Sequence, residues 1–288
     1  EWIVEGEPSM DLVDVDIARY HRFQGNSKYL YERSAESLGA IYHMHWPNRQ
    51  HETARPARKS PLHDRLATHN ACFGETAGWE RAMWFAPPGE EPKDIYSHHW
   101  PNWYEHTAQE CRAARTGVVM LDQSSFGKTL IQGNDACSFL QQLCAGDVDV
   151  PEGKLIYTQM LNHRGGIEAD ITVDRLAEDR YMIVSSADTH SRDLAWVEKN
   201  LPPKKRVAIT DITSAYAVLS IQGPRSRDLL ASVSDADLSN EAFPFLTSQE
   251  ISVGYALAIA KRVTFVGELG WELHIPSEFA QSVFDVLL

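Results

Sequence analysis

The sequence predicts an α+β protein, and three observations support that fold class. Strand-like and helical patterns follow one another in the order strand, helix, hairpin, strand, helix, strand. Of the 288 residues, 43% are hydrophobic and 10% are aromatic, which is enough to bury a substantial core. The longest apolar runs, such as Tyr255 to Ala260, are far shorter than the roughly 20 residues that a membrane span requires.

The first part of the chain is expected to combine one helical segment with a long irregular region. Helical periodicity runs from Ile17 through Ile41, after a turn at Gly6-Glu7-Pro8. From Thr53 to about Pro92 the chain is dense in Arg, Pro, Gly and Trp, which predicts well-packed loops rather than regular elements. A further helix is expected from Trp103 to Thr116.

The remainder of the chain is expected to alternate strands and helices. Strand formers predict strands at Val118 to Leu121, Tyr181 to Ser185 and Ala215 to Ile221. Helices are expected at Asp135 to Leu143, Thr189 to Leu201 and Arg225 to Ser232. Residues 251 to 275 predict three strands, separated by Ala260-Lys261 and by the segment from Gly267 to Gly270.

A β-hairpin over Ile156 to Val173 is the most informative stretch. The turn Arg164-Gly165-Gly166 supplies the positive φ angles that a tight hairpin needs. Because side chains alternate along a strand, the second arm places its apolar residues on one face and its polar residues on the other. The polar face is expected to carry Glu168, Asp170, Thr172 and Asp174. Spacing alone favours a solvated face, and a carboxylate site is the alternative.

A second motif covers Arg262 to Pro276, where two short β runs flank Gly267 and Gly270 and predict another hairpin. Three patterns then follow in order along the chain: MLN-x(2)-GG-x(3)-D-x-x-V, the turn Ile221-Gln222-Gly223-Pro224, and R-x(4)-GE-x-G-x-E. In order and spacing, these patterns resemble the folate-binding aminomethyltransferase domain of the glycine-cleavage T-protein.

The upstream sequence narrows this resemblance. Blocks at Ala54 to Leu66, Gly78 to Arg81 and Asp122 to Lys128 look like the dimethylglycine and sarcosine dehydrogenase family, and plain T-proteins lack the first two. The resemblance implies a T-protein-like folate-binding aminomethyltransferase domain preceded by the central, or connector, region of an FAD-dependent oxidoreductase. It places the tail of the FAD-oxidoreductase domain at residues 1–50, the central region at 51–105 and the T-protein-like domain at 106–288.

The family pattern also implies that the chain is a fragment. In the family, an FAD-binding domain precedes this region and a small β-rich domain follows it, so the folate-binding domain is expected to be truncated at its C-terminal end. No G-x-G-x-x-G fingerprint occurs in the chain, so FAD would belong to the missing N-terminal domain.

The resemblance assigns the catalytic role to Asp170, because the matching aspartate of the family lies against the folate. Capture of a one-carbon unit by tetrahydrofolate requires a folate nitrogen to lose a proton and a developing cation to be stabilised. One carboxylate can serve both purposes. A surface carboxylate on a strand is the alternative interpretation of Asp170.

Five further residues are candidates for cofactor binding. Glu272 matches a carboxylate that accepts hydrogen bonds from the 2-amino and N3–H edge of the pterin. Tyr157 and Leu161 would form a wall of the pocket, although core packing accounts for them equally well. Phe265 replaces a tyrosine that is common at its position, so a polar contact is in doubt while stacking on the pterin stays open. Arg262 could hold a folate carboxylate or an acidic neighbour such as Glu272, or it could serve the scaffold.

Charge and cysteine content narrow the classes of partner. The net charge of −13, from 27 basic and 40 acidic residues, opposes association with nucleic acid or anionic membranes. Four cysteines without a C-x-x-C pair favour a reducing compartment, and a bacterial cytoplasm and a mitochondrial matrix both fit. The pairs His43-x-His45 and His98-His99 lack further ligands at a diagnostic spacing, so no metal site is expected.

The resemblance implies the folate-binding half of an FAD-dependent N-methyl amine dehydrogenase, with dimethylglycine or sarcosine as the type of substrate. The FAD domain would remove a hydride from the amine, and the resulting iminium or formaldehyde would reach this domain to give 5,10-methylenetetrahydrofolate. The full-length flavoprotein would pass its electrons to an acceptor. Two alternatives stay open: a noncatalytic relative like the pyruvate dehydrogenase phosphatase regulatory subunit, and a T-protein-like aminomethyltransferase.

Overall fold

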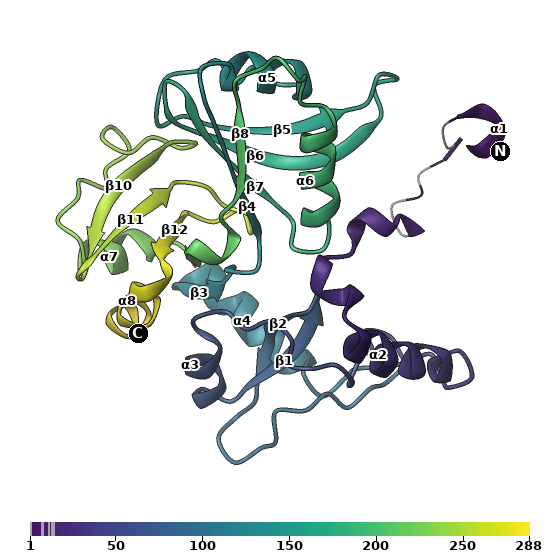
Figure 1. Cartoon of the computed structure of the whole chain (residues 1–288). Helices are drawn as coiled ribbons and strands as arrows, with labels where there is room; N and C mark the ends of the chain where they lie inside the picture. Colours follow the sequence, from purple (N-terminus) through teal and green to yellow (C-terminus); the bar gives the residue numbers. More distant parts are fainter. Residues whose placement is uncertain (1, 7–8, 11, 13–14) are drawn as a thin grey trace.

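Two five-stranded antiparallel sheets and one separate two-stranded hairpin organise the chain (Figure 1). The structure, a computed structural model, describes residues 2–6, 9–10, 12 and 15–288. Helices and strands are mixed along the sequence, so the predicted α+β class is confirmed.

The first third of the chain contains short helices and the two-stranded hairpin. Its elements are α1 (Trp2–Glu5), the 3-10 turns η2 (Ile17–Arg19) and η3 (Arg22–Gly25), α2 (Ser27–Ala40), α3 (His63–Thr68), β1 (Ala71–Thr76), β2 (Trp79–Phe85) and α4 (Tyr104–Thr116). The helix expected from Trp103 to Thr116 is therefore confirmed as α4. The helix expected from Ile17 to Ile41 is confirmed only from Ser27 onward. Tyr20 and Asn26, which follow the two 3-10 turns, have extended backbone angles that interrupt helical hydrogen bonding.

The prediction of irregular loops for residues 53 to 92 was wrong. Strands β1 and β2 pair as a hairpin that is closed by Ala77 and Gly78, with positive φ angles of 49° and 81°. A side chain at Gly78 would also collide with the ring of Phe23, which packs against it. The prolines of the region lie outside both strands and leave the ladder uninterrupted. The prolines of the region therefore mark the flanks of the hairpin and not its centre.

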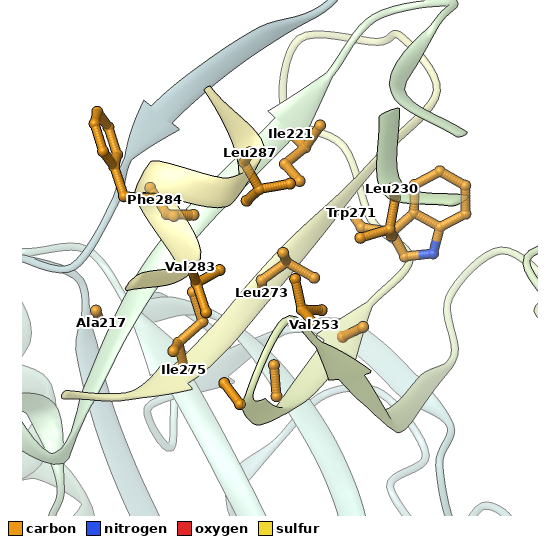
Figure 2. Packing of buried hydrophobic residues seen from close by; sticks show 14 of the residues in the cluster. Ala217, Ile221, Leu230, Val253, Trp271, Leu273, Ile275, Val283, Phe284 and Leu287 are labelled. Atoms are coloured by element: carbon orange, nitrogen blue, oxygen red, sulfur yellow. The ribbon is translucent and has the colours of Figure 1, made fainter. Parts of the chain in front are cut away.

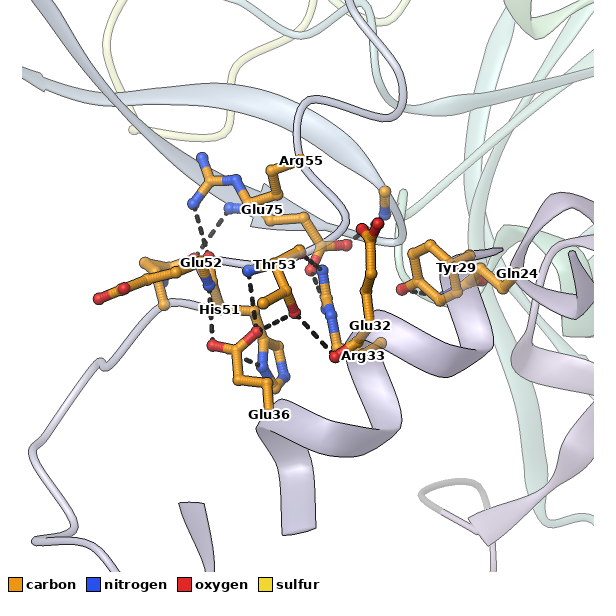
Figure 3. Close-up of polar contacts among 12 residues, drawn as sticks. Gln24, Tyr29, Glu32, Arg33, Glu36, His51, Glu52, Thr53, Arg55 and Glu75 are labelled. Atoms are coloured by element: carbon orange, nitrogen blue, oxygen red, sulfur yellow. Dashed lines mark hydrogen bonds and ion pairs between the residues drawn. The ribbon is translucent and has the colours of Figure 1, made fainter. Parts of the chain in front are cut away.

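Helix α2 is fastened to this hairpin by polar contacts (Figure 3). It contains no buried residue. Arg33 pairs with Glu75 of β1 at 2.8 Å and donates to the carbonyl oxygen of Thr53 at 2.9 Å. Glu36 accepts hydrogen bonds from the backbone N–H groups of Glu52 and Thr53 at 2.8 and 2.9 Å. We call these five residues the α2 network, because hydrogen bonding and charge pairing replace apolar burial along α2.

The first large sheet, the Glu272 sheet, has the strand order β10-β11-β12-β9-β3. Its strands are β3 (Val119–Asp122), β9 (Tyr216–Gln222), β10 (Ser248–Val253), β11 (Ala256–Lys261) and β12 (Gly270–Pro276). One face packs on α7 (Ser226–Ala231) and on α8 (Ala280–Leu287), which follows the 3-10 turn η5 (Ser277–Phe279). Figure 2 shows this core, where Trp271, Leu273 and Ile275 alternate along β12 and are fully buried.

Two details of the Glu272 sheet correct the sequence prediction. The break between the first two strands falls at Gly254 and Tyr255, where Gly254 has a positive φ of 56°, and not at Ala260-Lys261. Ala260 and Lys261 instead lie inside β11, opposite Leu273 and Glu272 of β12. Residues 262 to 269 form a loop between β11 and β12, so the expected strand from Arg262 is absent there.

The second large sheet, the Asp170 sheet, has the strand order β5-β6-β7-β4-β8. Its strands are β4 (Gly127–Gln132), β5 (Leu155–Leu161), β6 (Ile167–Ala177), β7 (Arg180–Ser185) and β8 (Ala208–Asp211). Helices α5 (Ala136–Leu143) and α6 (His190–Lys199) cover its apolar face, and the 3-10 turn η4 (Thr213–Ala215) leads into β9. The hairpin expected at Ile156 to Val173 is confirmed as β5 and β6. Strands β4 and β8 were not predicted.

The two large sheets meet through their polar faces. Lys261 of β11 lies 3.2 Å from the Asp174 carboxylate of β6, and the Ser248 hydroxyl of β10 donates to that carboxylate at 2.6 Å. The apolar residues of each sheet occupy the opposite, helix-covered face, because side chains alternate along the strands. The surfaces that face one another therefore carry the polar side chains of the two motifs.

Candidate functional site between the two sheets

Asp170 lies on β6 and is held by two side chains of β5. The Tyr157 hydroxyl donates to one carboxylate oxygen at 2.8 Å, and the Gln159 side-chain amide donates to the other at 2.9 Å. Gln159 lies directly opposite Asp170 in the ladder, and Tyr157 is two residues away on the same face. The hydrogen bond to Asp170 raises the pKa of Tyr157, so the phenol stays a donor at neutral pH. Asp170 is thus oriented while it remains exposed to solvent.

Glu272 lies on β12, the central strand of its sheet, and its side chain is 16% exposed. Ser220 of β9 and Lys261 of β11 are its partners on either side. The structure records no hydrogen bond to its carboxylate from the described residues, and Nε2 of His274 is 4.0 Å away. Burial raises the pKa of Glu272, whereas the charge of Lys261 lowers it. The carboxylate is therefore a nearly buried acceptor with unused hydrogen-bonding capacity.

A group of buried polar residues joins the strands of these two carboxylates. We define the inter-sheet network as Asp174, Ser248, Lys261, Glu272 and His274. The side chains of Lys261 and Asp174 are 1% and 0% exposed, so their ion pair is shielded from water. Burial, followed by the charges of Lys261 and the nearby Lys128, holds the pKa of His274 well below its usual range. Both ring nitrogens of His274 lack a hydrogen-bond partner among the described residues.

The carboxylates of β6 do not share one environment, and Glu168 departs from the predicted common polar face, which Asp170 and Asp174 keep. Glu168 pairs with Arg192 of α6 and accepts a hydrogen bond from Asn162 at 2.9 Å. Asp170 is exposed, whereas Asp174 is fully buried against the other sheet. The register of β5 and β6 shifts at Met160/Leu161, so the alternation is broken next to Glu168.

The remaining predicted site residues lie at different positions around the two carboxylates. Tyr157 contacts Asp170 and is 63% exposed, and Leu161 is half-buried at the end of β5. Phe265 is 91% exposed on the loop between β11 and β12. Arg262 donates to the carbonyl oxygen of Phe243 and to the Asn240 side chain, the latter at 2.7 Å. The hydrogen bonds of Arg262 therefore hold a neighbouring loop rather than Glu272.

Sequence reasoning missed Gln159 and Lys261. Gln159 could have been found, because it lies on the same face of the hairpin as Asp170 once the register of the strands is written out. Lys261 ends the apolar run Ala256 to Ala260, and a lysine in such a run is a signal for a buried charge. The turn predicted at Ala260-Lys261 conceals this signal. Its partner Asp174 is 87 positions away in the numbering, which no local pattern can reveal.

A cleft of about 650 Å³ lies elsewhere, between the tip of the β5–β6 hairpin, the N-terminal segment and α6. Glu168, Arg192 and Trp196 line it, and neither Asp170 nor Glu272 does. Arg192 is already paired with Glu168 and with Asp16.

In the described part of the chain, no three His, Cys, Asp or Glu side chains are placed to hold a metal ion. None of the helices among those residues is long and apolar enough to cross a membrane.

Two family profiles match the sequence. The profile described as GCVT N-terminal domain matches residues 62–288, and the profile described as FAD dependent oxidoreductase central domain matches residues 5–60. The finer division of the chain at residues 50 and 105 stays a prediction.

Three curated relatives align with 100% of the chain. 4-Methylaminobutanoate oxidase (formaldehyde-forming) of Paenarthrobacter nicotinovorans is 42% identical over 35% of its own length. The mitochondrial pyruvate dehydrogenase phosphatase regulatory subunit of Mus musculus is 35% identical over 34% of its length. The mitochondrial sarcosine dehydrogenase of Homo sapiens is 34% identical over 36% of its length. The chain therefore spans about a third of these relatives, two of which are named as oxidoreductases.

A solved structure shares the fold. The glycine cleavage system aminomethyltransferase T from Bartonella henselae matches with a TM-score of 0.66 and 25% identity, over 81% of this chain and 57% of that one. The expected T-protein-like architecture is thereby confirmed. With the GCVT profile covering most of the sequence and the oxidoreductase profile covering its beginning, the chain belongs to the GCVT domain family, as a member related to the sarcosine and dimethylglycine dehydrogenases.

Proposed function

We propose that the chain binds a reduced folate between its two large sheets and transfers a one-carbon unit to it, giving 5,10-methylenetetrahydrofolate. The observation that carries this proposal is the placement of Asp170 and Glu272 on the facing surfaces of two sheets that the Lys261–Asp174 pair holds together. One carboxylate is exposed and oriented, and the other is nearly buried with free acceptor atoms. These two environments suit two different tasks.

Glu272 would anchor the pterin ring. Its carboxylate can accept two parallel hydrogen bonds from a planar edge that presents an amino group and a ring N–H. Because the carboxylate is 16% exposed, a ligand that supplies those donors would replace the small amount of water that remains around it. The exposed rings of Tyr157 and Phe265 are available for stacking on the flat faces of the pterin.

Asp170 would manage the proton and the charge of the transfer. A bound tetrahydrofolate would supply the nitrogen atoms that accept the one-carbon unit. The Asp170 carboxylate can take the proton that such a nitrogen must release, and its negative charge stabilises positive charge that develops nearby. Tyr157 and Gln159 fix the orientation of Asp170 through its two oxygens.

We propose that the one-carbon unit comes from an N-methyl amine of the dimethylglycine or sarcosine type. In this proposal, FAD and the acceptor of its electrons belong to parts of a longer protein, because the sequence contains no dinucleotide-binding fingerprint. The related 4-methylaminobutanoate oxidase and sarcosine dehydrogenase support this class of substrate. A bacterial cytoplasm or a mitochondrial matrix would suit such an enzyme.

Calorimetric titration with tetrahydrofolate tests this function in wild type, Glu272→Ala and Asp170→Asn, after circular dichroism shows that all three are folded. Glu272→Ala should weaken binding by about 1–3 kcal/mol, because the donor edge of the ligand loses its partner. Asp170→Asn should retain binding and lose about 100-fold or more in the formation of 5,10-methylenetetrahydrofolate from formaldehyde above the spontaneous rate. Absence of folate binding by the folded wild type would overturn the proposal.

A second candidate is a noncatalytic binding module, as in a regulatory subunit. The observation in its favour is the 35% identity to the phosphatase regulatory subunit. This candidate would be supported if the wild type binds folate but shows no transfer activity, and if Asp170→Asn binds folate with the same affinity as wild type.

A T-protein-like aminomethyltransferase is the third candidate, and it is favoured by the structural likeness to aminomethyltransferase T. Transfer from an aminomethylated carrier protein, rather than from formaldehyde, would distinguish it.

A further inference from the structure

Lys261 occupies a position that connects the two proposed folate-binding carboxylates. It lies directly opposite Glu272 in the β11–β12 ladder, where facing side chains are about 5 Å apart at their Cβ atoms. Its ammonium group is also 3.2 Å from Asp174, which lies four residues beyond Asp170 on β6. The buried ammonium group of Lys261 therefore contacts Asp174 on the strand of Asp170, and Lys261 is the direct cross-strand neighbour of Glu272.

We propose that Lys261 is a positioning residue of the folate site, which keeps Glu272 ionised and holds the strand of Glu272 against the strand of Asp170. This inference rests on the proposed function, because it gives Lys261 a task in ligand recognition. An ionised Glu272 accepts two hydrogen bonds from the pterin edge, whereas a protonated Glu272 would oppose one of those donors with its own O–H.

The surroundings of Glu272 show why a cation is needed there. Burial raises the pKa of Glu272, and Lys261 is the neighbour whose charge counteracts the rise. His274 cannot replace it, because burial keeps this ring neutral.

Three other charged groups around this layer, Asp174, Lys128 and Asp122, each have partners other than Glu272. Asp174 faces Lys261 from β6. Lys128 on β4 donates to the carbonyl oxygens of Ser124 and Phe126, and burial lowers its pKa to about 7. Asp122 at the end of β3 accepts a hydrogen bond from Ser60.

The test measures the titration of Glu272 directly, in the absence of ligand. The carboxyl ¹³C signal of Glu272 is followed by NMR as the pH is changed, and the signal is assigned by its loss in Glu272→Gln. The test variant is Lys261→Met combined with Asp174→Leu, because removal of both charges leaves no unpaired buried carboxylate. The titration midpoint of Glu272 should rise by about one pH unit in this variant, a tenfold change in its ionisation equilibrium.

Asp174→Asn is the matched control, because it disturbs the same contact between the sheets but keeps the charge of Lys261. Its Glu272 midpoint should stay at or below the wild-type value. A midpoint that rises equally in both variants, or in neither, would overturn the proposal, since only the loss of the cation should matter. Amide NMR spectra with native dispersion establish that the variants are folded.

Titration with tetrahydrofolate between pH 5 and 8 completes the test. The double variant should lose affinity on acidification at a pH about one unit higher than wild type, while Asp174→Asn follows the wild-type profile. Parallel profiles in all three proteins would show a merely structural role and overturn the inference. Absence of folate binding in wild type would instead overturn the proposed function, so the two failures are distinguishable.

Discussion

The α2 network and the inter-sheet network are built from similar charged groups but use them differently. In the α2 network, Arg33 and Glu36 each contact more than one group, and the backbone of residues 52 and 53 takes part (Figure 3). In the inter-sheet network, both nitrogens of His274 lack a hydrogen bond and Glu272 accepts none from the described residues. The first network is locally satisfied, whereas the second keeps capacity for a ligand.

This difference separates polar groups that hold two elements of the fold together from polar groups that are available to bind a ligand. Polar groups that fasten two elements are stabilising when their hydrogen bonds are complete. Buried polar groups with free capacity destabilise the unliganded protein, and they are retained where a ligand completes them. Removal of a charge that already has its partners, such as Glu36 or Lys261, should therefore lower the free energy of unfolding, whereas removal of the unpartnered Glu272 charge should not.

The largest effect is expected for Lys261→Met alone. It leaves Asp174 buried and unpaired, which should lower the free energy of unfolding by about 3–5 kcal/mol. Urea denaturation at pH 7 measures the change. The additional Asp174→Leu change should restore most of the loss, because no uncompensated charge then remains. If the free energy of unfolding of Lys261→Met were within about 1 kcal/mol of the wild-type value, the description of a shielded ion pair would be wrong.

Acid should weaken the α2 network. Burial alone would raise the pKa of Glu36, but the Thr53 hydroxyl and the backbone N–H groups of Glu52 and Thr53 donate hydrogen bonds that lower it to about 2. A carboxyl group with a lowered folded-state pKa stabilises the protein above its unfolded pKa of 4.5, and this contribution disappears as the pH falls toward 2.

Glu36→Gln should therefore cost about 1–2 kcal/mol at pH 7, after allowance for screening near the surface, and less as the pH falls. Urea denaturation from pH 7 to 3 follows both proteins. Glu32→Gln is the control on the same helix, because the Glu32 side chain pairs with the exposed Lys28 and its backbone contact with Thr53 is unaffected by the substitution. Equal losses in the two variants would show that the hydrogen bonds of Glu36 add nothing.

Glu272→Gln should change the free energy of unfolding in the opposite direction to Glu36→Gln. Because burial raises the folded-state pKa of Glu272 above its ordinary value of 4.5, the folded protein holds its proton longer, and stability falls as the pH rises above that value. Removal of this charge should leave stability unchanged or raise it by up to about 1 kcal/mol at pH 8, with a smaller gain at pH 5. A large decrease in the free energy of unfolding at pH 8 would mean that Glu272 stabilises the sheet instead of binding a ligand.

The smallest change in stability is expected for Tyr157→Phe. The ring is 63% exposed and its hydroxyl donates to the exposed Asp170 side chain, so the urea midpoint should be unchanged. The rate of one-carbon transfer should fall, because Asp170 loses one of the two groups that orient it. Transfer equal to wild type would show that Gln159 alone positions Asp170.

Local patterns predicted much of the fold. The β5–β6 hairpin was found because the Gly165-Gly166 turn and the alternation of its second arm are both encoded within a short stretch. The same reasoning failed at β10 and β11, where an alanine-rich run concealed the turn at Gly254. The β1–β2 hairpin was missed because the prolines on its flanks, together with Gly74 and Gly78 within it, dominated the composition.

The candidate site was predictable only in part. Asp170 and Glu272 were identified through a family resemblance, and the structure puts them on the two sheets that face one another. Their individual environments could not be predicted, because burial and hydrogen bonding depend on residues far away in the chain. Arg262 illustrates the limit, since its partners Asn240 and Phe243 are brought to it by the loop that precedes β10.

By itself, the sequence determined the α+β class, the positions of most helices and strands, and the residues that alternate on each face. These properties depend on neighbours within a few positions, so periodicity and turn residues encode them. Only the tertiary structure decided that Asp174 is buried, that Asp170 is exposed and that Lys261 lies between the sheets. Those outcomes arise when two sheets stack on one another, because burial and charge pairing are properties of surfaces that meet rather than of segments of the chain.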